Sequence, residues 1–171
     1  MGNNGHAGQE WVSAALNRFE GRLLRYAQRI IGDPHRARDV VQETFLKLCR
    51  EDAAAMDGHL AQWLYTVCRN QALDVRRKES RMTAVAEPTL MEPGGREPAP
   101  DRTAEDREST ARILDCLDQL TPNQQECIRL KFQQGLSYRE ISAVTGLTAT
   151  NVGFLIHTGL KKVREKLNRE P

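Results

Sequence analysis

The sequence predicts an all-α protein of two small helical domains joined by a flexible acidic linker. Apolar residues recur three and four positions apart through most of the 171-residue chain, and no stretch alternates as a strand does. Charged residues make up 28% of the chain and aromatic residues only 5%, which is typical of water-soluble helical proteins. Residues 82–108 hold four prolines and 7 acidic against 3 basic residues, which favours a linker over a core element.

The first helix is expected from Trp11 to Ile31, after a polar start at residues 1–9 that we expect to fray. Its apolar stripe consists of Leu16, Phe19, Leu23, Ala27 and Ile30. The domain boundaries expected on this basis are an N-terminal tail and start of the first helix at 1–15, a first domain at 16–81, the linker at 82–108 and a second domain at 109–168.

The second helix is expected to begin after Gly32-Asp33-Pro34, with Asp33 as N-cap and Pro34 at the first helical position, and to run to about Cys49. One face of it is apolar: Ala37, Val40, Val41, Thr44, Phe45 and Leu48. The opposite face carries Asp39, Gln42, Glu43 and Lys47. Periodicity alone leaves two interpretations of this polar face open, a solvated surface or a docking surface for a partner protein.

A loop at 50–58 leads to a third helix expected from Leu60 to about Ser80, with Leu60, Leu64, Val67, Gln71 and Val75 in one stripe. This helix mixes amides, aromatic rings and cations: Gln62, Trp63, Tyr65, Thr66, Arg69, Asn70, Arg76, Arg77 and Lys78. Such a mixture suits single-stranded nucleic acid, because cations neutralise phosphates, rings stack on bases and amides bond to base edges. The alternative is that Trp63 and Tyr65 belong to the core and Asp74 pairs with Arg77 or Lys78.

In the second domain, Ile113, Leu114, Leu117 and Leu120 mark one helix, and Cys127, Ile128, Leu130 and Phe132 mark the next, closed near Gly135. Thr121-Pro122-Asn123-Gln124 and Ser137-Tyr138-Arg139-Glu140 both read as capping boxes. Gly146 supplies a residue that tolerates positive φ, and Thr148 restarts a helix. This order of short helix, tight turn and second helix predicts a helix-turn-helix that places its second helix in a DNA major groove.

The second helix of this motif is expected from Thr148 to about Leu167. Its early candidates for base contact are Thr148, Ala149, Thr150, Asn151 and Phe154, and Asn151 could bond an adenine edge. Tyr138 and Arg139 on the preceding helix are placed to meet phosphates, and Lys161, Lys162 and Arg164 are more suited to backbone contact or solvent. His157 is expected to pack against a helix. A helix-turn-helix used for protein contact is the alternative.

The remaining composition excludes several classes. The 16–81 block carries 13 basic against 9 acidic residues and the 109–171 block 9 against 6, so both are compatible with a polyanion. The four cysteines, Cys49, Cys68, Cys116 and Cys127, form no metal-ligand spacing and are expected to be small buried residues in a reducing cytosol. No signal peptide, membrane span, phosphate loop or cofactor motif is recognised, so we expect a cytoplasmic protein that is not an enzyme and binds no cofactor.

Four segments together resemble a family: Asp39–Lys47 (DVVQETFLK), Trp63–Arg77 (WLYTVCRNQALDVRR), Leu120–Gln125 (LTPNQQ) and Gly135–Ile141 (GLSYREI). In this order and spacing they are similar to those of bacterial extracytoplasmic-function sigma factors, over about residues 16–81 and 109–168. The resemblance implies a promoter-specificity subunit that binds RNA polymerase core and promoter DNA. Members of the family often bind an anti-sigma factor, so such a partner stays open here.

The resemblance also implies roles for particular residues. The region-two domain would dock on the polymerase β′ clamp through Asp39, Gln42, Glu43 and Lys47. Its third helix would meet the melted −10 element through Trp63, Arg69, Asn70, Arg76, Arg77 and Lys78. The loop Arg50–His59 would capture an extruded base, which stabilises melted DNA by binding alone.

The region-four domain would touch the β flap and read the −35 element through Tyr138, Arg139, Thr148, Thr150, Asn151 and Lys161. The chain departs from the family at Val152-Gly153-Phe154-Leu155-Ile156 and at Thr158-Gly159, where the family is more basic. Two glycines inside a helix cost about 1 kcal/mol each relative to alanine. Either Gly153 lets the helix approach the DNA backbone closely, or Phe154-Leu155-Ile156 packs on a partner. A regulator that binds duplex DNA or a protein without polymerase is the alternative to the sigma factor.

Overall fold

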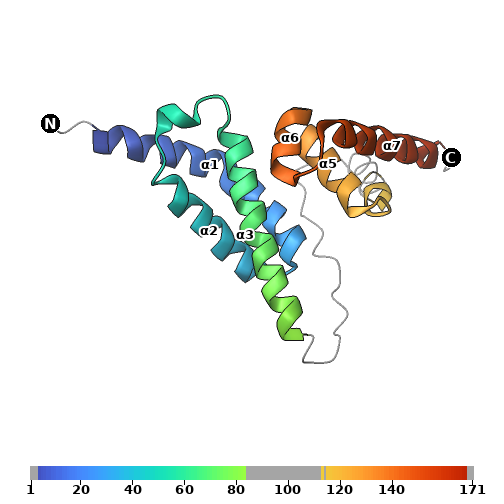
Figure 1. The fold of residues 1–171 in the computed structure, drawn as a ribbon, viewed down its shortest axis with the longest axis horizontal. Coiled ribbons are helices and arrows are strands. Elements are labelled where there is room, and N and C mark those ends of the chain that lie inside the picture. The colour runs from blue at the N-terminus through green and yellow to red at the C-terminus, as the bar shows by residue number, and fades with distance from the viewer. Residues whose placement is uncertain (1–3, 84–112, 114, 169–171) are drawn as a thin grey trace, which may run out of the picture. The chain divides into compact units, whose positions relative to one another are not determined.

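The computed structural model describes residues 4–83, 113 and 115–168, and every regular element in these ranges is a helix (Figure 1). The predicted all-α fold is therefore confirmed for the described chain. Two compact units are present, Met1–Gly95 and Arg96–Pro171. Most of the expected linker lies outside the described residues.

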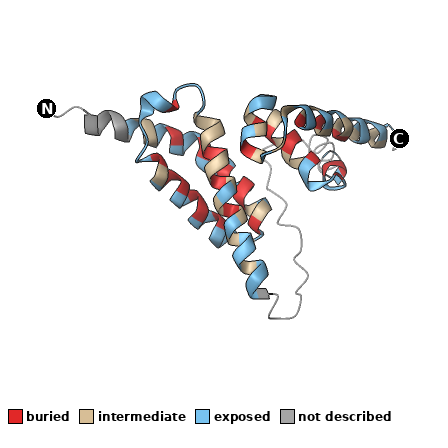
Figure 2. Cartoon of the chain, viewed as in Figure 1, coloured by how far each residue is buried: buried red, intermediate tan, exposed pale blue. Residues whose placement is uncertain are grey.

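The first unit packs three helices against one another: α1 (Asn4–Ile31), α2 (Pro34–Leu48) and α3 (Leu60–Thr83), with a short 3-10 turn, η1, at Ala53–Met56. Helix α1 begins earlier than the expected Trp11, so residues 4–9 are helical, and α3 ends later than the expected Ser80. All six residues predicted for the inner face of α2 are buried, and they form part of the red core in Figure 2.

One expected core residue of α1 is on the surface. Phe19, Leu23 and Ala27 are buried as the stripe requires, and Ile30 is half-buried. Leu16 is 36% exposed because the buried side of α1 runs here through Ala15 and Phe19, each 4% exposed, and Leu16 lies about 100° to one side of Ala15.

The N-cap of α2 shows why the start of this helix could be predicted from neighbouring residues alone. The Asp33 carboxylate accepts hydrogen bonds from the backbone N–H groups of His35, at 2.8 Å, and Arg36, and these bonds lower the pKa of Asp33. Arg36 also pairs with Glu79 near the end of α3. The cap predicted from sequence therefore lies beside an ion pair that joins α2 to α3.

The second unit contains a helical turn at 115–118, then α5 (Pro122–Phe132), α6 (Tyr138–Thr145) and α7 (Ala149–Leu167). Both predicted capping boxes are present, with each cap hydroxyl accepting from the N3 backbone and each N3 side chain bonding back. Gly146 adopts φ 76° and Thr148 caps α7. The predicted helix-turn-helix is therefore confirmed as α6, a tight turn and α7.

Ile113, one of the residues expected to mark a helix of the second unit, is 45% exposed, and two further expectations of burial were also wrong. Phe132 is 62% exposed because it is the last residue of α5, where the chain leaves the helix. Cys49 is exposed because it is the C-cap of α2, past the last turn of the buried face. The other three cysteines are buried as expected.

Candidate DNA and polymerase interfaces

The outer face of α2 is a polar surface with an apolar residue at its centre. Asp39, Gln42 and Glu43 are exposed and Lys47 is half-buried. Leu46, which the sequence analysis did not single out, is 56% exposed. It follows Gln42 by four positions and Glu43 by three, so helical spacing places it on the same face. A single exposed leucine needs no explanation by itself, and here it stands among the residues predicted to bind polymerase.

A groove of about 300 Å³ between α2 and α3 joins two sets of residues that the sequence analysis kept apart. Asp39, predicted to contact polymerase, lines it together with Lys78, predicted to contact DNA. Gln71 lies in the same groove and donates from its amide to the Thr44 hydroxyl at 3.3 Å. The two predicted surfaces of the first unit therefore adjoin along this edge.

The two aromatic residues of α3 have different environments. Tyr65 is fully buried and packs edge-on against Tyr26, with 5.1 Å between ring centroids. Burial raises the pKa of its hydroxyl. Trp63 is only half-buried. The core interpretation is thus right for Tyr65, whereas Trp63 keeps part of its ring accessible for stacking.

The polar candidates on α3 spread over a wide arc of the helix. Trp63, Asn70 and Arg77 are spaced by seven residues and form one line along it. Arg69 and Arg76 lie one residue earlier, about 100° to one side, and Lys78 lies about 100° to the other side. Arg69 is half-buried, whereas Asn70, Arg76, Arg77 and Lys78 are exposed.

One of these cations is already paired, as the alternative interpretation required. Arg77 Nη1 lies 3.1 Å from the Asp74 carboxylate, and both side chains are largely exposed. An exposed pair of this kind contributes at most about 1 kcal/mol, so the guanidinium can exchange its partner for a phosphate.

The loop expected to capture a base contains η1 and is mostly exposed. Asp52 caps η1 by accepting from the Ala54 N–H at 3.1 Å, and Met56 is its buried anchor. The remaining residues from Arg50 to His59 are exposed.

In the second unit the predicted DNA-binding residues lie on α6 and the first half of α7, except Lys161 further along. Tyr138, Arg139, Thr148, Thr150, Asn151 and Lys161 are all exposed. The Thr148 hydroxyl accepts from the Asn151 N–H at 3.2 Å, so this side chain already serves as the helix cap. Thr150 and Asn151 keep their side chains at the N-terminal end of α7, where recognition helices contact bases.

The recognition side of α7, defined here as Thr150, Phe154, His157 and Lys161, follows a spacing of three and four residues. All four are exposed, and Phe154 is 64% exposed. The expectation that His157 packs against a helix was wrong, because the buried side of α7 is formed by Val152, Ile156 and Gly159 instead.

The space beside Gly153 is filled by another side chain of the same unit, Tyr138. A Cβ at this position would lie 3.4 Å from Cε2 of Tyr138, so the tyrosine ring rests against α7 where the glycine has no side chain. Lys131 Nζ lies 5.4 Å from the centroid of the same ring. The close approach at Gly153 is therefore made by Tyr138, and Ile156 packs in the unit's own core and not on a partner.

Thr158 and Gly159 face α5. The buried Gln124 amide donates to the Thr158 hydroxyl at 3.0 Å. A Cβ at Gly159 would lie 2.7 Å from Cδ1 of Ile128, so only glycine lets the two helices pack this closely. The departure from the family at these positions therefore has a packing cause.

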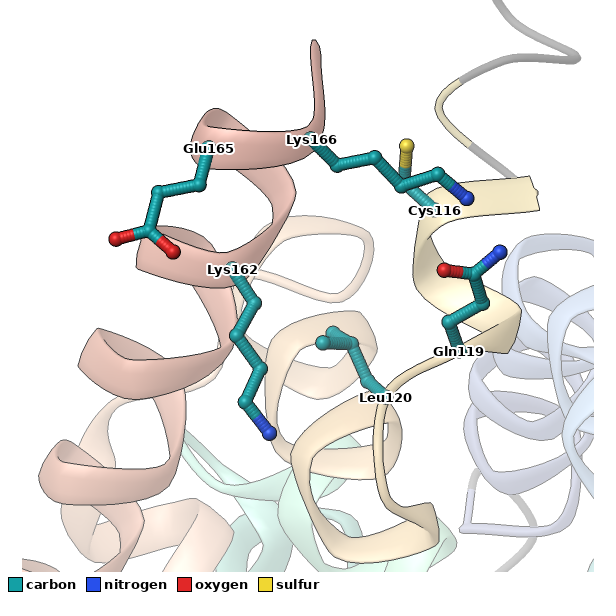
Figure 3. Close-up of a pocket in the computed structure, with 6 residues that line it drawn as sticks. All are labelled: Cys116, Gln119, Leu120, Lys162, Glu165 and Lys166. Atoms are coloured by element: carbon teal, nitrogen blue, oxygen red, sulfur yellow. The ribbon is translucent and has the colours of Figure 1, made fainter. Parts of the chain in front are cut away.

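A second groove, of about 270 Å³, lies near the C-terminal end of α7 and is lined by Cys116, Gln119, Leu120, Lys162, Glu165 and Lys166. Figure 3 shows Lys166 extending toward Cys116 and Lys162 toward Leu120. Lys162 therefore differs from Lys161, which belongs to the recognition side. Among the described residues, no group of three or more His, Cys, Asp or Glu side chains could hold a metal ion.

Two family models match this chain. Residues 15–82 match sigma-70 region 2, and residues 110–163 match sigma-70, region 4. The described part of the chain contains no helix with the length and apolarity that a bilayer crossing requires.

Similar proteins bear related names. RNA polymerase sigma factor CarQ of Myxococcus xanthus is 31% identical over 169 residues, which cover 93% of this chain and 94% of CarQ. ECF RNA polymerase sigma factor SigE of Mycolicibacterium smegmatis is 33% identical over 148 residues, 85% of this chain and 57% of SigE. For ECF RNA polymerase sigma factor BldN of Streptomyces coelicolor the identity is 30%, over 76% of this chain and 50% of BldN. The chain thus spans about half the length of SigE and of BldN.

A solved structure shares the fold. The sigma factor RpoE of Bartonella quintana, crystallised with the anti-sigma factor NepR, superposes with a TM-score of 0.72 at 22% identity, covering 93% of this chain and 98% of RpoE. Family models, relatives and fold agree on one class, a sigma-70-type transcription factor. Within that class, the chain belongs to the ECF sigma factors, since ECF RNA polymerase sigma factor SigL of Mycobacterium tuberculosis is 32% identical over 83% of this chain and 80% of SigL.

Proposed function

We propose that this chain directs core RNA polymerase to particular promoters, reading the −10 element with its first unit and the −35 element with its second, and stabilising melted DNA by binding. The observation that supports this most directly is the recognition side of α7, an exposed helix face in a module that matches sigma region 4. The proposal includes no catalytic step, and it places the protein with polymerase and promoters in the cytoplasm.

In this proposal the outer face of α2 binds the polymerase β′ clamp. Asp39, Gln42, Glu43 and Lys47 supply the polar contacts, and the exposed Leu46 supplies apolar area at their centre. In protein interfaces a few fully covered residues near the centre supply most of the binding energy, and the surrounding contacts exclude water. The β flap is the proposed partner of the second unit.

The cations of α3 act on the non-template strand of the −10 element. Arg76, Arg77 and Lys78 lie on three adjoining sides of the helix end, which suits a strand that wraps the helix better than a flat duplex. Trp63, with part of its ring accessible, is the proposed stacking residue. The exposed loop from Arg50 to His59 is the proposed receptor of an extruded base.

An anti-sigma protein is proposed as a further partner. The likeness to RpoE, which was crystallised with NepR, supports this.

The test compares binding to polymerase with promoter melting. Wild-type chain mixed with core polymerase should co-elute from a sizing column, and the holoenzyme should open a promoter chosen from the host genome by mapping bound sites. Arg76→Ala combined with Arg77→Ala should keep co-elution and reduce open-complex formation, read by permanganate reactivity of unpaired thymines. Arg22→Ala, which removes an exposed cation of α1 outside every proposed surface, is the matched control.

Loss of co-elution and melting in equal measure would contradict the assignment of α3. Binding to duplex DNA without any association with core polymerase would refute the proposed function and favour a regulator that acts without polymerase.

A further inference from the structure

The recognition side of α7 has an aromatic ring at its centre. Phe154 is 64% exposed, one turn after Thr150 and one turn before His157. A single exposed ring needs no explanation by itself. Here, however, it is the residue directly after Gly153, against which the ring of Tyr138 rests, and Tyr138 is itself 42% exposed. Two accessible rings therefore lie at neighbouring positions of the helix-turn-helix.

The charges around this ring indicate which kind of surface covers it. No Asp or Glu occurs between Glu140 and Glu165, a range that includes the turn and most of α7. Glu140 is bonded to the Ser137 backbone N–H in its capping box. Two cations belong to the same unit: Lys131 Nζ lies over the Tyr138 ring, and Lys161, on the recognition side two turns after Phe154, pairs with Glu165 at 4.0 Å. An apolar centre on a stretch without acids fits a groove lined by phosphates, because no carboxylate between Glu140 and Glu165 would repel them.

The major groove offers one apolar group at its base edges, the 5-methyl group of thymine. A phenylalanine in the first half of a recognition helix can contact this methyl group, and it has no hydrogen-bonding group with which to read any other base edge. We propose that Phe154 reads a thymine methyl group in the −35 element, a specificity contact that rests on the proposed function of the second unit.

The test removes the methyl group from the DNA and the ring from the protein. Wild-type holoenzyme first selects −35 sequences from a randomised duplex library. Each thymine of the selected element is then replaced by deoxyuridine, which keeps every hydrogen bond and lacks only the methyl group. At one or two positions the wild type should bind the deoxyuridine duplex about 4-fold more weakly, the effect expected for burying one methyl group. Phe154→Ala should bind the two duplexes equally, and Phe154→Leu should keep part of the difference.

Phe132→Ala is the matched control, because Phe132 is 62% exposed in the same unit but lies at the end of α5 and not on the recognition side. It should keep the full preference for thymine. Since Phe154 is exposed, its variants should keep the helical content of the wild type by circular dichroism.

Three outcomes would overturn the inference. The wild type shows no preference for thymine over deoxyuridine at any position, or Phe154→Ala keeps the preference as fully as Phe132→Ala does. In the third, Phe154→Ala weakens binding to core polymerase while the methyl preference persists, which assigns the ring to a protein partner. Failure of the proposed function looks different, because the wild-type chain would then form no holoenzyme or its holoenzyme would select no −35 sequence.

Discussion

The two glycines inside α7 should respond differently to the same substitution. Replacing glycine by alanine in a helix interior stabilises the helix by about 1 kcal/mol when the new methyl group finds room. At Gly153 the methyl carbon would meet Tyr138 Cε2 at 3.4 Å and Cδ2 at 3.7 Å, which is ordinary contact. Gly153→Ala should therefore stabilise the second unit by close to the full amount.

At Gly159 the same methyl carbon would lie 2.7 Å from Ile128 Cδ1, about 1 Å inside the normal separation of two carbons. Ile128 is only 5% exposed, and Gln124 Cβ and Leu120 Cδ1 approach the new carbon to 3.5 Å, so the side chain has little space to move. Overpacking of this kind costs about 1–3 kcal/mol. Because the helix-propensity gain is common to both variants, Gly159→Ala should be less stable than Gly153→Ala by about 1–3 kcal/mol.

Amide hydrogen exchange of α5 and α7 in the full chain measures this difference locally. Both tryptophans, Trp11 and Trp63, belong to the first unit, so tryptophan fluorescence during urea unfolding is an internal control that neither variant should change. Ile128→Val removes the clashing Cδ1 atom, and combining it with Gly159→Ala should recover part of the loss. The reasoning is refuted if Gly159→Ala proves as stable as Gly153→Ala, or if Ile128→Val and Gly159→Ala are simply additive.

Three further predictions concern buried side chains. Thr158→Val leaves the buried Gln124 amide without the hydroxyl it donates to, and it should lower the stability of the second unit, measured by amide hydrogen exchange, by about 1–3 kcal/mol. Thr158→Ser keeps the hydroxyl and should cost less, so equal effects of the two variants would show that the hydroxyl is unimportant. A thiol reagent should modify Cys49 in the native protein and the other three cysteines only on unfolding, so rapid reaction of all four would contradict the described burial. Burial raises the pKa of Cys68 from 9.0 to about 12, so the unfolded thiol ionises first and stability of the first unit should fall above pH 9 by up to about 1.4 kcal/mol per pH unit. Urea titrations followed by tryptophan fluorescence at pH 9 and 10 should show a steeper slope in the wild type than in Cys68→Ala, because Tyr65, whose unfolded hydroxyl begins to ionise near pH 10, adds the same slope to both proteins.

Local signals in the sequence predicted most of the helices correctly. The caps at Asp33, Thr121, Ser137 and Thr148 and the turn at Gly146 depend only on residues within a few positions of one another, so they can be recognised without knowing the fold. The inner face of α2 could also be predicted from the sequence, because helical periodicity places its apolar residues on one side. The resemblance to sigma factors could be recognised for the same reason, since each of the four matching segments is continuous in sequence.

Only the tertiary structure decided which helix faces are covered. Periodicity gives the angle between two residues on a helix, but the covered angle depends on helices that are distant in sequence. For that reason His157, Cys49 and Leu46 proved to be exposed, and Tyr65 to be core. Sequence likewise marked Gly153 and Gly159 as costly positions in a helix, and only the packing of Ile128 against α7 shows why glycine stands at Gly159, whereas Gly153 has ordinary room for a methyl group beside Tyr138.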